Sequence, residues 1–239
     1  MILQRMTMSD IETKAFEVVN VACKETSQRL FVTPVFEFVE HLKDKHNVKF
    51  SLGVGLGFDN TGRKILGVFK RQRPYEILID SKVIHDHNRL KFTISHELGH
   101  LALHRHLALP EEDYNIYEEP EFNTILQRKE FTCSRHWVEW QANYFAGAFL
   151  VPKIRLYRAL LEIQNEIGVK RNLGKIYVTS ERSSYKDLNR VIDELSKRFC
   201  VSEGLIITRL RQLKLYFDSH NRNIVRKLSS FEVSEIKKC

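Results

Sequence analysis

The chain has 239 residues, of which 43% are hydrophobic and 28% are charged, a composition typical of a globular protein with a core of its own. Its net charge of +8 favours an acidic partner, nucleic acid above all, without requiring one. No apolar run approaches the roughly 20 residues of a membrane span, and the N-terminal stretch lacks the basic start, apolar core and cleavage site of a secretory signal.

Four widely separated cysteines carry no disulfide or metal-binding pattern. Cys23, Cys133, Cys200 and Cys239 include no CxxC pair, so a cysteine-rich zinc site is not expected. Reduced thiols are the ordinary state of such cysteines inside a cell. Together with the missing signal and span, the cysteines predict a cytoplasmic protein with no membrane partner.

Hydrophobic spacing predicts two helices and then a small sheet in the first third of the chain. The helices are expected over residues 9–24 and 34–45, the second with Thr33 as its N-cap and Pro34 in its first turn. The strands are expected over residues 49–56, 64–70 and 75–79.

Helices dominate the rest of the chain. One is expected over residues 89–104, an acidic loop over 110–121, and a second apolar helix over 137–150. The pattern predicts an α+β fold, with a first domain over residues 1–180 and a helical, helix–turn–helix-like segment with a basic tail over residues 181–239.

Four histidines fall between His96 and His106, and the first two belong to the pattern HExxH. On a helix, four residues turn through roughly 400° and rise roughly 6 Å, so His96 and His100 share a face and can reach one cation. Glu97 points about 100° away, where it can take a proton from a water that the cation activates. The pattern predicts a metallohydrolase, and Gly99 is expected to leave room beside the metal.

A catalytic zinc needs a third protein ligand. His106 has the spacing of the metzincin pattern, but Leu103 stands where that pattern needs glycine. His104 is expected beside the ligands or facing substrate. Glu139 is the better candidate, because Asn143 shares its helix face and could hold a ligating imidazole. The alternative for Glu139 is a surface carboxylate.

Two segments carry a family resemblance. FTISHELGHLALH and EWQANYFAGAFLVP together resemble the ImmA/IrrE family of metallopeptidases, over roughly residues 30–215. The resemblance implies a zincin-like fold in which His96, His100 and Glu139 bind zinc and Glu97 is the base. Family members are anti-repressors that cleave helix–turn–helix repressors, often encoded beside them, so a repressor is the implied protein substrate.

The segment between the two motifs departs from the family. Glu139 follows His100 by 39 residues, a longer gap than expected, and the gap contains the acidic stretch 110–121. That stretch could gate the cleft, mimic substrate or recognise a basic partner; the plainer interpretation is a solvated insertion.

The hypothesis is therefore site-specific, zinc-dependent proteolysis of a transcriptional repressor. A further donor should stabilise the oxyanion, and the candidates are His136, Tyr144, His104 and Tyr185. The rival hypothesis is a DNA-binding transcriptional regulator with a structural metal site, which would have four protein ligands. Manganese or iron would also accept two nitrogens and one oxygen.

The segment VSEGLIITRLRQL resembles the helix–turn–helix-like segment that follows the peptidase core in this family. Arg209 and Arg211 could contact DNA, which would make nucleic acid a second partner. In the alternative, the helix pair packs on the peptidase core and recognises the repressor.

Overall fold

A computed structural model of the chain describes residues 6–25, 31–59, 62–107, 115–117, 134–169, 172–179 and 182–218. The chain separates into two compact units, the first formed by residues 1–153 and 199–202 and the second by residues 154–198 and 203–239. Each unit is described by itself. The domain boundary predicted after residue 180 stays a prediction.

The first unit contains a mixed four-stranded sheet with the strand order β1-β3-β2-β4. Its strands are β1 (Lys49–Val54), β2 (Ile65–Lys70), β3 (Glu76–Asp80) and β4 (Asn115–Tyr117). β1 runs parallel to β3, whereas β2 is antiparallel to both β3 and β4. The acidic stretch was predicted as a loop, but three of its residues form β4, a strand at the edge of the sheet. The rest of the stretch lies outside the described residues.

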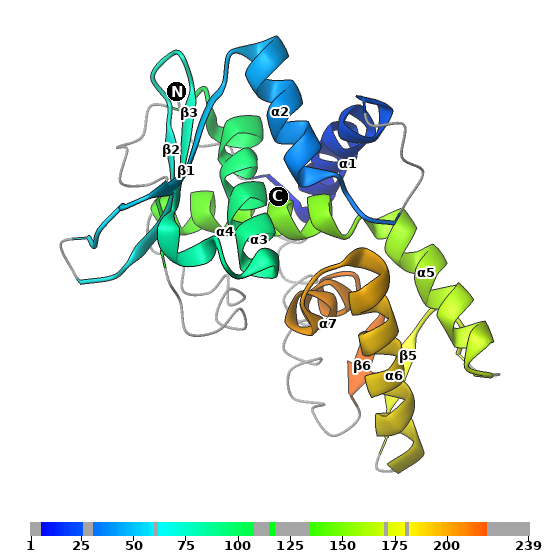
Figure 1. Cartoon of the computed structure of the whole chain (residues 1–239). Helices are drawn as coiled ribbons and strands as arrows, with labels where there is room; N and C mark the ends of the chain where they lie inside the picture. The colour runs from blue at the N-terminus through cyan, green and yellow to red at the C-terminus, as the bar shows by residue number, and fades with distance from the viewer. Residues whose placement is uncertain are drawn as a thin grey trace, which may run out of the picture. The chain divides into compact units, whose positions relative to one another are not determined.

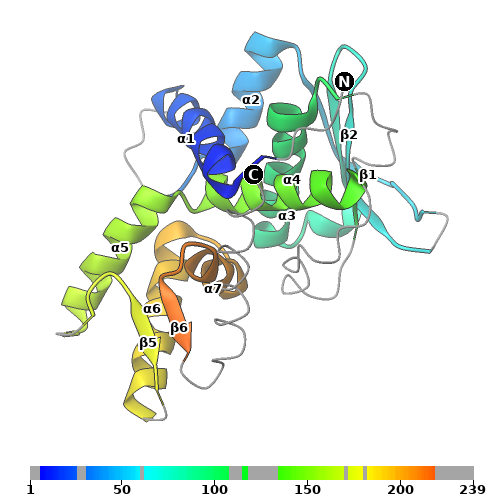
Figure 2. The ribbon, with the colours of Figure 1, turned by 180° about the vertical axis from the view of Figure 1, so that it is seen from behind.

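The described helices of the first unit are α1 (Met8–Glu25), α2 (Val35–His46), the short 3-10 helix η1 (Ser81–Val83), α3 (His87–Gly99), its π-helical continuation η2 (His100–His104) and α4 (Ser134–Leu150). In Figures 1 and 2, helices α1, α2 and α3 lie to one side of the sheet. α3 packs most extensively on α4, and Figures 1 and 2 show α4 crossing α3 from opposite sides. Every residue from Leu90 to Gly99 is buried, so polar groups on α3 need partners inside the protein.

Two local expectations were wrong in an informative way. Thr33 is not the N-cap of α2, because Pro34 occupies that position and the Thr33 hydroxyl donates to the carbonyl of Phe149, 2.8 Å away. The hydroxyl thereby satisfies a carbonyl near the C-terminus of α4. Gly99 does not leave room for a metal; a Cβ there would lie 3.1 Å from the Cα and carbonyl oxygen of Ala142. The glycine allows α3 and α4 to approach closely.

The second unit contains α5 (Lys153–Glu166, whose first residue belongs to the first unit), α6 (Arg182–Phe199), α7 (Glu203–Gln212) and two short parallel strands, β5 (Ile176–Val178) and β6 (Tyr216–Asp218). Tyr177 and Phe217 stack across the strand pair with ring centroids 4.9 Å apart. α6 buries Leu188, Val191 and Leu195. The helix–turn–helix assignment of this segment stays a prediction.

Two expectations from the sequence concerned membrane-spanning helices and disulfides, and the structure gives findings on both for the described residues. None of the described helices combines the length and apolar character that a membrane crossing needs. Cys23 and Cys200 form no disulfide, and Cys133 and Cys239 lie outside the described residues.

Candidate metal centre

Three side chains, one each from α3, η2 and α4, converge inside the first unit. The Nε2 atoms of His96 and His100 lie 2.9 Å apart. The carboxylate of Glu139 approaches these nitrogens to 3.3 and 3.4 Å respectively. The sequence prediction had proposed these three residues as ligands, and the structure brings them together: one possible ligand atom from each lies within 4.8 Å of the others.

The donor set fits a divalent cation. Four-coordinate zinc with bonds of about 2.0–2.1 Å holds its ligand atoms roughly 3.3 Å apart, close to the distances between these three side chains. Both imidazoles are fully buried, while the side chain of Glu139 is 21% exposed. Among the described residues, this is the group of histidines, cysteines and acids that could hold a metal ion, and it offers three ligands rather than four. A set of three is typical of catalytic sites, and structural zinc sites have four.

The two carboxylates of the site have opposite pKa shifts. Burial alone would raise the pKa of Glu139, but its close contacts with the imidazoles of His100 and His96 outweigh burial and lower that pKa to about 2. Burial raises the pKa of Glu97 well above its ordinary value, and the negative charge of Glu139 adds to the effect. Carboxyl groups whose pKa values are pushed apart in this way commonly divide into a permanent anion and a group that exchanges protons.

Glu97 has no hydrogen-bond partner among the described residues, although both of its carboxylate oxygens are buried. A buried carboxylate without a partner is costly, so its position next to the cluster calls for a functional reason. One oxygen of Glu139, Oε1, is in the same situation. A cation would give Oε1 of Glu139 a partner, and a water on that cation would give the Glu97 carboxylate one.

The distal nitrogens of both imidazoles have partners from the same two helices. Nδ1 of His96 donates to Oδ1 of Asn143 at 2.8 Å, the role that sequence spacing had suggested for Asn143. Nδ1 of His100 lies 3.0 Å from Nδ1 of His104, whose Nε2 is 2.9 Å from Oε1 of Gln141. Burial, helped by the neighbouring His100, lowers the pKa of His104 to about 3, so its ring is neutral at physiological pH.

Comparison with known families now adds to this geometry. Residues 52–211, more than half of the chain, match the family model of the peptidase M78, or IrrE N-terminal-like, domain. The chain belongs to this family. The expected membership in the ImmA/IrrE metallopeptidases is thereby confirmed, and with it metallopeptidase chemistry in general. Comparison with curated proteins gave no match.

Sequence reasoning about this M78 site missed Gln141. Within WVEWQANYFAGAFL, the part of α4 that runs through the core, the acidic and amide side chains are Glu139, Gln141 and Asn143. All three reach the cluster or its hydrogen-bonded neighbours. Polar residues inside an otherwise apolar helix are the signal that would have found Gln141.

The structure tests the other predicted site residues to different degrees. The Tyr144 hydroxyl donates to Oε1 of Glu12 on α1 at 2.9 Å, so it is committed away from the proposed ligands. His106 is exposed and accepts from the Arg105 side chain. His136 is exposed in the first turn of α4, one turn before Glu139, and Tyr185 belongs to the second unit. Of the oxyanion donors considered, His136 and Tyr185 stay predictions, whereas His104 has both ring nitrogens engaged.

In the second unit, Arg209 is not available to contact DNA. Its side chain is fully buried, and Nη1 donates to Oε1 of Gln212 at 2.8 Å. The possible DNA contact through Arg209 is therefore not supported, because Arg209 falls on the buried face of α7. The guanidinium of Arg211 instead lies 5.3 Å from the ring of Tyr216.

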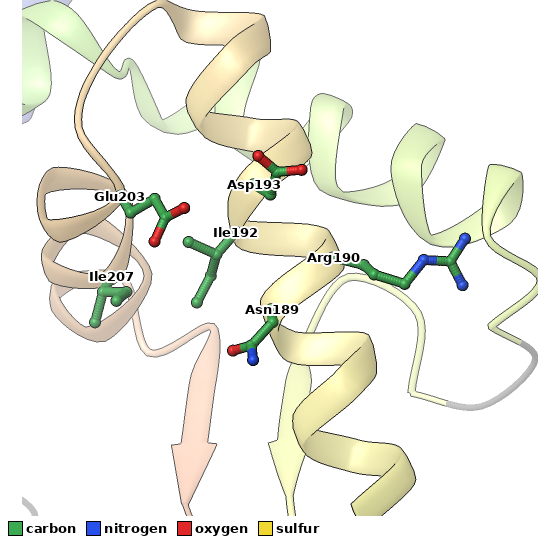
Figure 3. A pocket seen from close by; sticks show the side chains of 6 residues that line it. All are labelled: Asn189, Arg190, Ile192, Asp193, Glu203 and Ile207. Atoms are coloured by element: carbon green, nitrogen blue, oxygen red, sulfur yellow. The ribbon is translucent and has the colours of Figure 1, made fainter.

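The second unit also has an open hollow between α6 and α7 (Figure 3). It is lined by Asn189, Arg190, Ile192, Asp193, Glu203 and Ile207. Figure 3 shows Ile192, Ile207 and Glu203 converging on it, with Arg190 turned away. This lining contains neither histidine nor cysteine, and within the described part of the chain its two acids belong to no metal-binding group. The chemistry therefore favours the cluster in the first unit, and not this hollow, as the candidate active site.

Proposed function

We propose that the chain is a zinc-dependent metalloprotease that cleaves a helix–turn–helix transcriptional repressor in the cytoplasm and so relieves repression. The observation that carries this proposal is the buried, unpartnered carboxylate of Glu97 beside the His96, His100 and Glu139 cluster. Family membership supports the peptidase activity, and the donor set supports zinc, with manganese as the alternative.

His96, His100 and Glu139 would hold the cation. When bound, it would polarise the scissile carbonyl and lower the pKa of a water. Glu97 takes the proton from the attacking water and delivers it to the leaving amine as the peptide C–N bond breaks. The raised pKa of Glu97 suits this work, because a group that gives back the proton it takes functions best with a pKa near the working pH.

The architecture supports a zincin-like core. A mixed sheet precedes the helix that carries HExxH, and a second helix supplies Glu139 across a close α3–α4 contact. A helix–turn–helix-like pair is supported by the short connection between α6 and α7, where Cys200 has a positive φ of 51°.

Charge supports the choice of partner. The sequence of the first unit contains as many acidic as basic residues, so the whole net charge of +8 belongs to the second unit. A repressor bound to its operator is surrounded by DNA phosphate. A basic second unit would therefore attract the enzyme to that complex, with nucleic acid as a second partner.

The test is Glu97→Gln, assayed on helix–turn–helix repressors from the same genome, beginning with any that is encoded next to this chain. We expect the variant to bind zinc as the wild type does and to cleave roughly 10²- to 10⁴-fold more slowly, because it has lost the proton acceptor. Glu76→Gln is the matched control; Glu76 pairs with Lys70 on the sheet surface and should be dispensable. Cleavage is followed by gel and intact-mass analysis, and zinc by elemental analysis.

Equal cleavage by wild type and Glu97→Gln would contradict the mechanism. The rival function, a DNA-binding regulator with a structural metal, predicts a different pattern. In that case the wild type would cleave no repressor, bind operator DNA directly, and unfold when zinc is removed.

A further inference from the structure

We propose that Gln141 is a positioning residue for the metal centre, acting through His104 to determine which nitrogen of His100 carries a proton. The inference rests on the proposed function and deepens it. Oε1 of Gln141 is 2.9 Å from Nε2 of His104, and Nδ1 of His104 is 3.0 Å from Nδ1 of His100. Three side chains thus form one hydrogen-bond chain, the Gln141 relay, that runs from α4 to a proposed ligand.

The direction of each hydrogen bond in the relay follows from counting protons. The carbonyl oxygen of Gln141 can only accept a hydrogen bond, so Nε2 of His104 must carry a proton and donate to it. A neutral imidazole has one N–H, which makes Nδ1 of His104 an acceptor. Nδ1 of His100 must then donate to it. The lone pair of His100 is left on Nε2, the atom that faces His96 and Glu139.

The reverse arrangement shows what Gln141 controls. If residue 141 donated an N–H to Nε2 of His104 instead, the proton on each ring of the relay would move to the other ring nitrogen. His104 would donate from Nδ1, His100 would accept there, and Nε2 of His100 would carry a proton into the cluster. A protonated nitrogen cannot bind a metal. Gln141 therefore sets the ligating state of His100 although it does not contact the ligand.

The rings of the two histidine ligands are fixed by separate hydrogen bonds. Asn143 fixes His96 directly, because its Oδ1 accepts from Nδ1 of that ring at 2.8 Å. His100 is fixed through an intermediate ring, which the π-helical turn of η2 brings against it with centroids 5.2 Å apart. Gln141 and His104 are both buried, with 0% and 1% exposure, so water does not compete for these hydrogen bonds.

The first experiment measures zinc affinity by competition with a chromophoric chelator, in wild type and Gln141→Leu. We expect the leucine variant to bind zinc about 10- to 100-fold more weakly, the usual cost of losing a partner behind a ligating histidine. Gln164→Leu is the matched control. Gln164 is also buried and uses both amide atoms, accepting from the Gly174 amide and donating to the Lys175 carbonyl in the second unit. That variant should lose stability and keep the zinc affinity of the wild type.

A second experiment needs no substitution. Nitrogen-15 NMR of ring-labelled histidines in zinc-free wild type should show His104 protonated on Nε2 and His100 protonated on Nδ1. If Gln141→Leu fails to fold, two variants of His104 can replace it in the zinc-affinity measurement. His104→Asn can offer Oδ1 where Nδ1 stood, so it should bind zinc more tightly than His104→Leu.

The outcomes separate this inference from the proposed function. Zinc-free wild type with His100 protonated on Nε2 would overturn the relay, and so would Gln141→Leu with wild-type zinc affinity. A wild type that binds no zinc would instead contradict the proposed function. The NMR experiment is made without metal, so it would still decide the protonation of His100 in that case.

Discussion

The two units of the chain differ in where the charged groups that bear on function lie. In the first unit these groups are buried on α3, η2 and α4: two imidazoles, the Glu97 carboxylate and the mostly buried Glu139. In the second unit, ion pairs lie nearer the surface, such as Arg198–Glu162 at 2.7 Å and Lys197–Asp193 at 2.6 Å. Burial shifts pKa values and makes chemistry available, whereas exposed charge gives long-range attraction.

The difference also predicts where single substitutions matter. Exposed ion pairs contribute about 0–1 kcal/mol each, because water and salt screen them. Buried polar groups interact more strongly, and each one leaves a partner unsatisfied when it is removed. We therefore expect the first unit to be sensitive to single atoms, and the second unit to respond mainly to its total charge and to ionic strength.

The largest effect is expected for Glu139→Ala. Removing the carboxylate leaves two imidazoles, which should weaken zinc binding by at least about 100-fold, since catalytic zinc is usually held by three protein ligands. Glu162→Ala is the control in the second unit, where Glu162 pairs with Arg158 and Arg198 and should not affect metal. Elemental analysis and zinc titration give the answer. Undiminished zinc in Glu139→Ala would show that another residue is the third ligand.

Much of the metal centre and of the secondary structure around it could be predicted from local sequence. HExxH places two imidazoles on one helix face wherever the helix forms, and the Glu139–Asn143 spacing does the same on α4. The two amphipathic helices and three strands of the first third of the chain also follow from local periodicity, with ends that differ by only a few residues. Short-range geometry is enough for these features, because each involves residues within one or two turns of each other.

What could not be predicted depends on contacts between distant segments. Tyr144 was a candidate oxyanion donor until α1 supplied Glu12 as its partner. Gly99 was assigned to the metal, but it is α4 that comes close to it. Arg209 looked available until the buried face of α7 was known. In each case the residue type was informative, and the partner came from a different element of the fold.

A pH dependence should distinguish the buried histidines from the surface charges. Burial lowers the folded-state pKa of His104 from its ordinary value of 6.5 to about 3. The unfolded chain therefore binds a proton that the folded chain refuses, and stability is lost as pH falls below about 6.5. Relative to His104→Asn, zinc-free wild type should lose on the order of 2 kcal/mol of unfolding free energy between pH 7.5 and pH 5.

Urea unfolding at the two pH values, with chelator present, measures this difference. The comparison with His104→Asn is needed because Glu97 has the opposite linkage. Its raised pKa means that the folded protein binds the extra proton, so that contribution to stability is lost as pH rises. Parallel pH dependence in wild type and variant would mean that His104 titrates normally in the folded protein.

A comparison of one glycine from each unit includes the smallest expected effect, that of Gly204→Ala. Gly99 faces the backbone of Ala142, with its Cα and carbonyl oxygen 3.1 Å from an added Cβ, whereas a Cβ on Gly204 of α7 would meet nothing within 4 Å. Alanine favours a helix over glycine by up to about 1 kcal/mol, so Gly204→Ala should be neutral or slightly stabilising. Gly99→Ala should lose about 1–3 kcal/mol, because α4 must move to accept the methyl group.

The Gly99 substitution also probes the metal centre, because the α3–α4 separation sets how far Glu139 lies from His96 and His100. Weaker zinc binding in Gly99→Ala, with unchanged binding in Gly204→Ala, would tie close helix packing to the geometry of the cluster. Equal stability of the two variants would mean that α4 yields freely at Ala142. In that case the three ligands would owe their positions to their own hydrogen bonds rather than to the fit of the helices.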